Sequence, residues 1–135
     1  MEAIHHFKKG ESMTIQKRVT EDDTTLLYGS GSIEKLLSTP SLVALMQEAS
    51  YRLLDRELPE GIITVSKEAS VRHSKPTPLG SVVSIKVTIQ DVATDELTLR
   101  MEAFDESGMI GTGTHTRAFV SHQNLLNRAS SRVVT

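Results

Sequence analysis

The hydrophobic pattern of this chain changes period at Gly61, and this change limits what the chain can fold into. Before Gly61, the stretch STPSLVALMQEASYRLLDRE spaces its apolar residues three and four positions apart, as one face of an α-helix does. After Gly61, apolar and polar residues alternate in several short segments, which is the pattern of half-buried β-strands. We therefore expect one long helix followed by a sheet.

The helix is predicted to run from Pro40 to about Glu57. Thr39 is a favourable N-cap residue, and Pro40 then takes the first helical position, where its missing N–H costs nothing. The turn sequence LPEG at residues 58–61 ends the helix. The break YGSGS at residues 28–32 separates the helix from the preceding segment.

Strands are predicted before and after the helix, at residues 12–19, 62–73, 81–92, 97–104 and 109–120. In 62–73 one face carries Ile63, Val65, Ala69, Val71 and His73, with Lys67 as an exception. In 81–92 and 97–104 the apolar faces are Val83, Ile85, Val87, Ile89 and Leu97, Leu99, Met101, Ala103. In the last strand His115 shares a face with Met109, Arg117 and Phe119. Short turns between strands predict antiparallel neighbours and an α+β architecture.

The length and composition favour one domain of ordinary size, residues 1–135, with loosely held ends at 1–10 and 127–135. A net charge of -2 and 4% aromatic residues argue against a nucleic-acid partner. The absence of cysteine excludes disulfides and thiol nucleophiles, and the histidines form no metal set. Because no apolar run resembles a signal peptide or a membrane span, we expect a soluble, cytoplasmic protein.

Gln47 and Glu48 stand side by side in the predicted helix, so they face different directions. With Leu42 at zero on a helical wheel, Gln47 falls near ~140°, at the margin of the apolar stripe. Glu48 falls near ~240°, where Arg52 follows it in the favourable acid-then-base order. We therefore predict that Gln47 borders the buried side and that Glu48 is solvated. A helix beginning one residue later would instead turn Glu48 inward.

Three segments together resemble the hot-dog-fold thioesterases of the fluoroacetyl-CoA thioesterase type: YGSGSIEKLLSTPSLVALMQEAS, TVSKEASVRHSKPTPLGSVV and FDESGMIGTGTHTRAFV. The resemblance extends over residues 12–121. It includes STP before the helix, the spacing from His73 to Gly80, and the series Gly113, His115 and Arg117. It implies a hot-dog fold, an antiparallel sheet of five or six strands wrapped around one long central helix. It also implies a homodimer or dimer of dimers with an acyl-CoA site between protomers.

The same resemblance implies a site made of a threonine before the helix, a glutamate two turns into it and a histidine on the next strand. Thr39 and His73 match the threonine and the histidine, but the glutamate position is Gln47. An amide can orient water or hold a carbonyl, but it cannot act as a nucleophile or base at neutral pH. His73 could then be the base. Glu48 is the alternative carboxylate if the helix register differs.

These residues predict an acyl-CoA thioesterase that hydrolyses a small or medium acyl thioester without a metal or other cofactor, CoA being part of the substrate. Because of Gln47, the alternative is a non-catalytic hot-dog protein that binds acyl-CoA or another ligand. A hot-dog hydratase is less favoured, since no Asp-to-His pair has the spacing of that family. Candidate contacts to the CoA phosphates are Arg72, Lys75 and Arg117. His115 is predicted to be structural or to lie near the interface.

Overall fold

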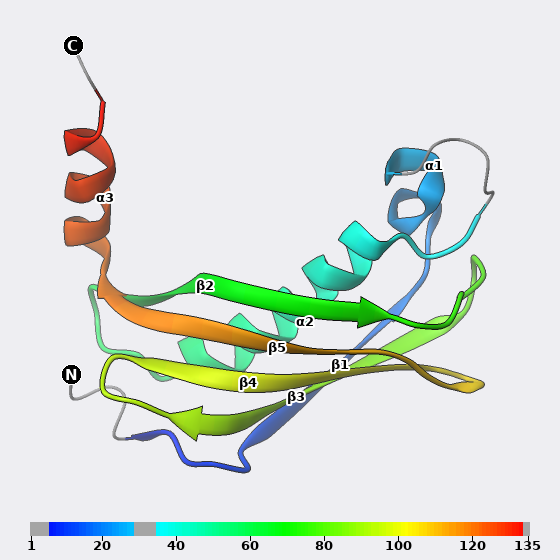
Figure 1. The fold of residues 1–135 in the computed structure, drawn as a ribbon, viewed down its shortest axis with the longest axis horizontal. Coiled ribbons are helices and arrows are strands. Elements are labelled where there is room, and N and C mark those ends of the chain that lie inside the picture. The colour runs from blue at the N-terminus through cyan, green and yellow to red at the C-terminus, as the bar shows by residue number, and fades with distance from the viewer. Residues whose placement is uncertain (1–5, 29–34, 134–135) are drawn as a thin grey trace.

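The computed structural model describes residues 6–28 and 35–133, so most of the predicted break at residues 28–32 lies outside the described residues. Within these ranges, five antiparallel strands form a sheet in the order β1-β3-β4-β5-β2 (Figure 1). The strands are β1 (Ser12–Arg18), β2 (Ile62–His73), β3 (Val82–Val92), β4 (Glu96–Asp105) and β5 (Gly108–Ser121). The predicted α+β arrangement of one long helix and an antiparallel sheet is confirmed.

The long helix α2 (Thr39–Asp55) crosses one face of the sheet (Figure 1). Its buried residues are Ser41, Leu42, Leu45, Met46, Ala49, Ser50, Leu53 and Leu54. The prediction that Thr39 caps the helix was wrong, because the Ser38 hydroxyl is the cap and accepts the Ser41 N–H at 3.2 Å. Thr39 is the first helical residue, so its hydroxyl is available to another partner.

The two central strands follow the predicted alternation. On β3 and β4 the buried side chains are Val83, Ile85, Val87, Ile89, Leu97, Leu99, Met101 and Ala103. They pack with the apolar face of α2 in one core. Burying this apolar surface stabilises the fold by about 25 cal/mol for each Å² removed from water.

The edge strand β2 departs from the prediction, because a bulge inverts its alternation. The pairing with β5 shifts between Ser66 and Glu68, so Lys67 is an extra residue in β2. Before the bulge, Thr64 lies opposite buried Phe119 and therefore faces α2. Ile63 and Val65 point to the other face, contrary to the prediction that they share a face with Val71 and His73.

A second register shift, between Ala103 and Phe104 on β4, changes the start of β5. Ile110 is buried and Met109 is 43% exposed, so the predicted phase of Met109 with His115 was wrong. Further along β5, Gly113 allows the backbones to approach closely. A Cβ at Gly113 would lie 2.5 Å from the Ser70 carbonyl oxygen.

Both ends of the described chain are more structured than the sequence predicted. Residues 127–131, expected to be loosely held, belong to helix α3 (His122–Ser131), which points away from the sheet in Figure 1. The helix has no buried residue, and the Ser121 hydroxyl caps it. Near the N-terminus, Phe7 is buried with its ring centroid 5.6 Å from that of Phe119. The Gly10 N–H donates to the Ile89 carbonyl at 2.9 Å.

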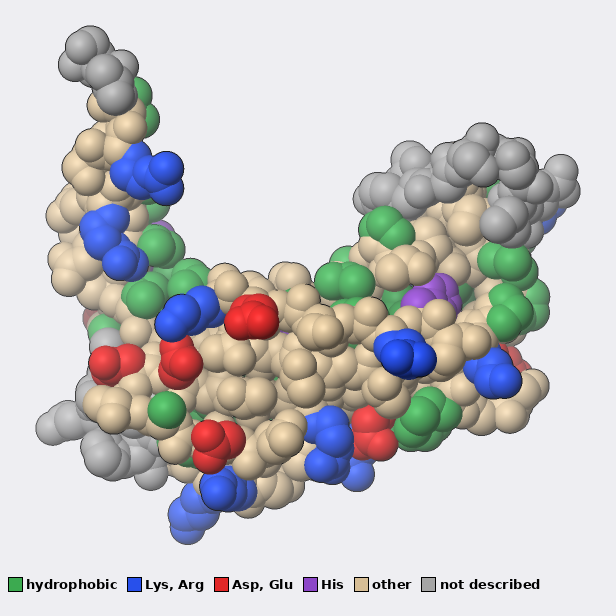
Figure 2. Space-filling model, in the orientation of Figure 1, with side chains coloured by type: hydrophobic (Ala, Val, Ile, Leu, Met, Phe, Trp, Pro, Cys, Tyr) green, Lys and Arg blue, Asp and Glu red, His purple; other side chains and the backbone are tan. Residues whose placement is uncertain are grey.

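The short elements η2 (Glu21–Asp23) and α1 (Thr25–Tyr28) precede α2. Figure 2 shows the surface hollowed between α3 and the end of the molecule that carries α1, with acidic and basic side chains interspersed below the hollow. Within residues 6–28 and 35–133, no helix has the length and apolar character needed to cross a membrane.

Candidate functional site

The first turn of α2 and the end of β2 meet at a hydroxyl–imidazole pair. Thr39 Oγ1 lies 2.7 Å from His73 Nδ1. The strand end is held in place because the Ser74 and Lys75 N–H groups both donate to the Ile110 carbonyl, at 2.8 and 3.2 Å. The structure therefore brings together two of the three residues that the resemblance implied.

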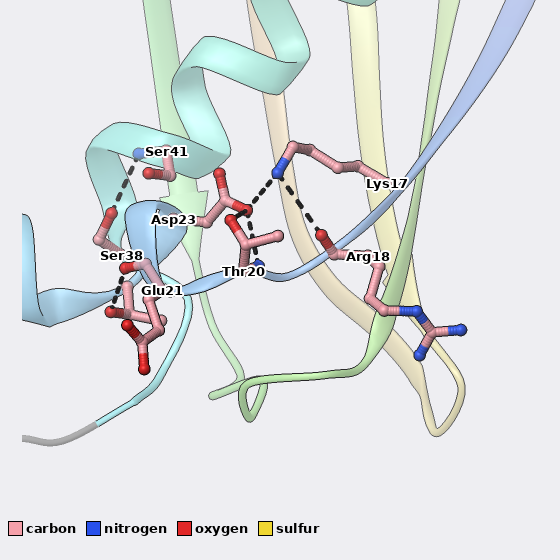
Figure 3. Close-up of polar contacts among 8 residues, drawn as sticks. Lys17, Arg18, Thr20, Glu21, Asp23, Ser38 and Ser41 are labelled. Carbon is pink, nitrogen blue, oxygen red and sulfur yellow. Dashed lines mark hydrogen bonds and ion pairs between the residues drawn. The ribbon is translucent and has the colours of Figure 1, made fainter.

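Several hydrogen bonds anchor the start of α2, and with it Thr39 (Figure 3). The Ser38 N–H donates to the Asp23 carbonyl at 2.9 Å. The Asp23 carboxylate receives hydrogen bonds from the Lys17 ammonium and from Thr20. Burial alone would raise the pKa of Asp23, but these hydrogen bonds outweigh it and lower that pKa below 3.8. The carboxylate thus stays ionised and the corner stays fixed at neutral pH.

The imidazole of His73 is half-buried and neutral at neutral pH. Burial lowers the pKa of His73 below its ordinary value of 6.5, although a hydrogen bond with the Lys75 backbone opposes the shift. A neutral imidazole has one N–H and one bare nitrogen, so Nδ1 either accepts the Thr39 proton or donates to the Thr39 oxygen. When Nδ1 donates, Nε2 is the bare nitrogen and can act as a general base.

A shallow depression of about 250 Å³ opens beside His73 and extends to Thr25. Its other lining residues are Leu36, Leu37, Ser74, Lys75 and Pro76. Of the three basic residues predicted to contact CoA phosphates, Lys75 lies here, whereas Arg72 lines a different depression together with Arg100. Lys75 and Arg72 therefore remain candidates for contacts to the CoA phosphates.

Arg117 does not fit the prediction that it holds a CoA phosphate. Its side chain is 6% exposed and donates to the Thr64 hydroxyl and carbonyl at 3.0 and 2.9 Å. The Thr64 hydroxyl in turn donates to Asp55 at 2.6 Å. Arg117 therefore links β5, β2 and the end of α2 inside the protein.

Gln47 and Glu48 are both half-buried, so their burial does not separate them as the helical wheel predicted. Glu48 forms an ion pair with Arg52 at 3.1 Å, so the one-residue shift that would turn Glu48 inward does not occur. Gln47 is half-buried and lies on the same helical ridge as Thr39 and Asp55, at successive four-residue steps. At 1.5 Å per residue, Gln47 is about 12 Å along the helix from Thr39. Within one chain, Gln47 is therefore too far along the helix to take part in the Thr39–His73 pair.

That ridge runs antiparallel to β2. Its first residue contacts the strand end at His73, and its last residue, Asp55, accepts from Thr64 near the strand start. Gln47 lies midway on the ridge, so it faces the middle of β2. The exposed residues 66–70 lie there.

A second polar cluster, which was not predicted, lies under this part of β2. His115 is fully buried, with Nε2 2.8 Å from Ser66 Oγ and Nδ1 3.0 Å from Ser50 Oγ. Burial and then the Arg117 charge lower the pKa of His115 to about 4. The prediction that His115 is structural agrees with this burial. Only the unforeseen bulge at Lys67 turns Ser66 toward it.

Within the described part of the chain, no group of three or more His, Asp or Glu side chains is placed to hold a metal ion. The antiparallel sheet with one long helix across its face defines a hot-dog fold.

The chain belongs to the fluoroacetyl-CoA-specific thioesterase family, whose model matches residues 19–123. A fluoroacetyl-CoA thioesterase from Streptantibioticus cattleyicolor is 30% identical over 86 residues. That match covers 64% of this chain and 62% of the relative, which is less than two thirds of its length.

Two solved structures extend the likeness to nearly the whole chain. A hot-dog-like protein from Thermanaerovibrio acidaminovorans has a TM-score of 0.92 and 29% identity, covering 100% of this chain and 99% of that chain. A variant of the fluoroacetyl-CoA-specific thioesterase FlK in complex with fluoroacetate and CoA has a TM-score of 0.82 and 27% identity. It covers 88% of this chain and 99% of that chain.

Proposed function

We propose that this protein hydrolyses acyl-CoA thioesters with small or medium acyl groups, and that the Thr39–His73 pair is at the centre of the reaction. The observation that carries the proposal is the 2.7 Å contact between Thr39 Oγ1 and His73 Nδ1 at the first turn of α2. Membership of the fluoroacetyl-CoA-specific thioesterase family supports the substrate class.

In the proposed reaction, the Nδ1–H of neutral His73 donates to the Thr39 oxygen, so Nε2 removes a proton from water, and the hydroxide attacks the thioester carbonyl carbon. The Thr39 hydroxyl donates its own proton to the carbonyl oxygen. The positive end of the α2 dipole favours the negative charge that develops on the carbonyl oxygen. The C–S bond then breaks, and the CoA thiolate takes the proton held by the imidazole. The products are a carboxylic acid and free CoA.

Gln47 has a place in this scheme only if it comes from a second copy of the chain, because it is about 12 Å from Thr39 along the same helix. The edge strand β2 supports a homodimer. Its residues 66–70 are exposed, and an unpaired strand edge is a template for another strand. Two β2 strands pairing antiparallel bring Gln47 of one copy toward the site of the other. Its amide then orients the attacking water.

Lys75 is the basic residue proposed to contact a CoA phosphate. It lines the depression beside His73, so a CoA molecule with its thioester at the imidazole passes close to this ammonium group. Arg72 is a weaker candidate, since it lines a separate depression.

A second candidate function is binding of acyl-CoA without hydrolysis. Gln47 favours it, because the glutamate implied by the family resemblance is replaced by a group that cannot act as a base. Hydrolysis predicts release of CoA and binding alone predicts none, so one experiment separates the two functions.

The test is release of CoA from a panel of acyl-CoA thioesters, followed with a thiol-reactive dye. The chain has no cysteine, so the dye reports CoA alone. We expect turnover by the wild type and a loss of about 100-fold in kcat/KM for His73→Asn. His122→Asn, at an exposed histidine on α3, is the matched control and keeps full activity. Binding by calorimetry without any turnover would instead support the second function.

A further inference from the structure

A second hydroxyl–imidazole pair lies in the middle of β2, where the proposed hydrolysis by Thr39 and His73 makes no use of it. Ser66 Oγ is 2.8 Å from His115 Nε2. The other ring nitrogen, Nδ1, is 3.0 Å from Ser50 Oγ on α2. His115 is fully buried, whereas Ser66 is exposed. The three side chains form a line from the core to the surface.

The hydrogen-bond partners fix the direction of the protons along this line. Ser50 Oγ is also 2.8 Å from the Met46 carbonyl oxygen, which can only accept, so the Ser50 hydroxyl donates its proton there. The Ser50 oxygen then accepts the N–H of His115 Nδ1. A pKa of about 4 keeps His115 neutral, so its Nε2 carries no proton. Nε2 therefore accepts the proton of the Ser66 hydroxyl.

This is the arrangement of an activated serine: a hydroxyl donates to an imidazole whose second nitrogen is oriented by a third group. The bulge at Lys67 creates it, since it places Ser66 on the same face of the sheet as His115 of β5. Gln47, midway along the helical ridge, faces the same stretch of β2. The Ser66 hydroxyl with its base His115 thus lies near position 47, where the family resemblance implies a glutamate.

We propose that Ser66 is an acyl-accepting nucleophile, with His115 as its base and Ser50 as the positioning residue for the imidazole. The substrate class is the acyl thioester of the proposed function, so this inference rests on that function and deepens it. Two β2 strands paired antiparallel and centred near Ser70 set His73 of one copy opposite the bulge of the other. Both hydroxyl–imidazole pairs then serve one site.

In this scheme the reaction has two steps, and the water activated by His73 attacks an acyl ester on Ser66 rather than the thioester itself. Ser66 Oγ forms a bond to the thioester carbonyl carbon, and its proton passes to His115 Nε2. The C–S bond breaks, and the CoA thiolate takes this proton and leaves as free thiol. Water, deprotonated by the His73 of the second copy, then attacks the acyl ester. The bond to Ser66 breaks, its oxygen recovers a proton from that imidazole, and the carboxylic acid leaves.

The first test is labelling with an alkyl fluorophosphonate, a reagent for activated serines, read by intact mass and peptide mapping. We expect one adduct, on Ser66, with a labelling rate about 100-fold lower in Ser66→Ala. Ser12→Ala is the control, because Ser12 is an exposed serine on the opposite edge strand β1. It labels like the wild type. No adduct, or an adduct on Thr39, overturns the inference.

A second pair of variants keeps the test valid if Ser66→Ala folds poorly. The chain has no cysteine, so Ser66→Cys and Ser12→Cys each carry a single thiol. The neutral imidazole can accept the thiol proton as the bond to the reagent forms, so we expect alkylation by iodoacetamide at pH 7 to be about tenfold faster in Ser66→Cys than in Ser12→Cys. Equal rates in two variants with native circular dichroism overturn the inference.

Turnover of acyl-CoA separates this inference from the proposed function. CoA release by the wild type, with an unchanged rate in Ser66→Ala and no adduct, overturns the role of Ser66 and leaves the proposed function standing. An adduct on Ser66 without CoA release supports the nucleophile and refutes the thioesterase. An acyl adduct on Ser66 in acid-quenched wild type during turnover supports both.

Discussion

At the scale of single residues, His73 and His115 differ in burial and in what they contact. His73 is half-buried at the end of β2 and contacts Thr39, beside a depression open to solvent. His115 is fully buried between Ser50 and Ser66. Both have a lowered pKa, but only that of His115 reaches about 4. Because a neutral imidazole is required in each place, acid should affect both.

The pKa of His115 predicts a loss of stability in acid. The ring takes up a proton near pH 6.5 in the unfolded chain but only near pH 4 in the folded protein. Between these values the unfolded chain binds more protons, so stability is full above pH 6.5 and falls as the pH drops toward 4. The contribution lost between pH 7 and pH 5 is about 2 kcal/mol.

Urea unfolding of the wild type and of His115→Gln at pH 7 and pH 5 measures this contribution. The variant is less stable at pH 7, but it loses about 2 kcal/mol less than the wild type on acidification. His73 titrates in both proteins, so its effect cancels. An equal loss in both proteins would show that His115 does not titrate in this range.

At the scale of elements, strand alternation was predicted correctly where the strand has no bulge and incorrectly where a bulge inverts it. The alternation of β3 was predictable, because residues from Val83 to Ile89 keep one phase. The alternation of β2 was not, since the extra residue Lys67 inverts the phase, and its one trace in the sequence is Lys67 itself, the exception on the predicted apolar face. Helix α3 was missed because most of its residues are polar and none of them is buried.

Gly113 tests how tightly β2 and β5 pack. In Gly113→Ala the new Cβ would meet the Ser70 carbonyl oxygen at 2.5 Å and Met101 Cε at 3.1 Å. The carbonyl cannot move without disturbing the β2–β5 pairing, so we expect a destabilisation of about 1–3 kcal/mol. Thr114→Ala, at the neighbouring exposed position, is the control. Urea unfolding of Gly113→Ala within 0.5 kcal/mol of the wild type, roughly the effect of a surface change, would contradict this contact.

At the scale of the whole molecule, one copy of the chain supplies only part of each proposed site, and a second copy supplies the rest. Thr39 and His73 meet within one protomer, whereas Gln47 faces the exposed middle of β2. The hot-dog fold and the Thr39–His73 pairing were expected from the family resemblance. Helix periodicity predicted that Gln47 borders the buried side and that Glu48 is solvated, but both are half-buried. No sequence pattern placed Ser66 against His115, since that contact joins two segments distant in sequence.

A dimer through β2 has a direct test by sedimentation velocity. The wild type should sediment at micromolar concentration as a dimer of the 14.8 kDa chain. Ser70→Lys sets two like charges opposite each other at the centre of the pairing and should raise the dissociation constant about fivefold. Thr114→Lys changes the residue paired with Ser70 on β5, away from the edge, and remains dimeric. A monomeric wild type would refute this assembly.

The central claim is that Thr39 and His73 act as one unit on an acyl thioester. Its most direct test is CoA release by Thr39→Val, His73→Asn and the double variant, measured with the same acyl-CoA. Because residues that act together give non-additive losses, we predict that the double variant is about as slow as the slower single variant. Full activity in both single variants, or losses that multiply in the double variant, would contradict the account.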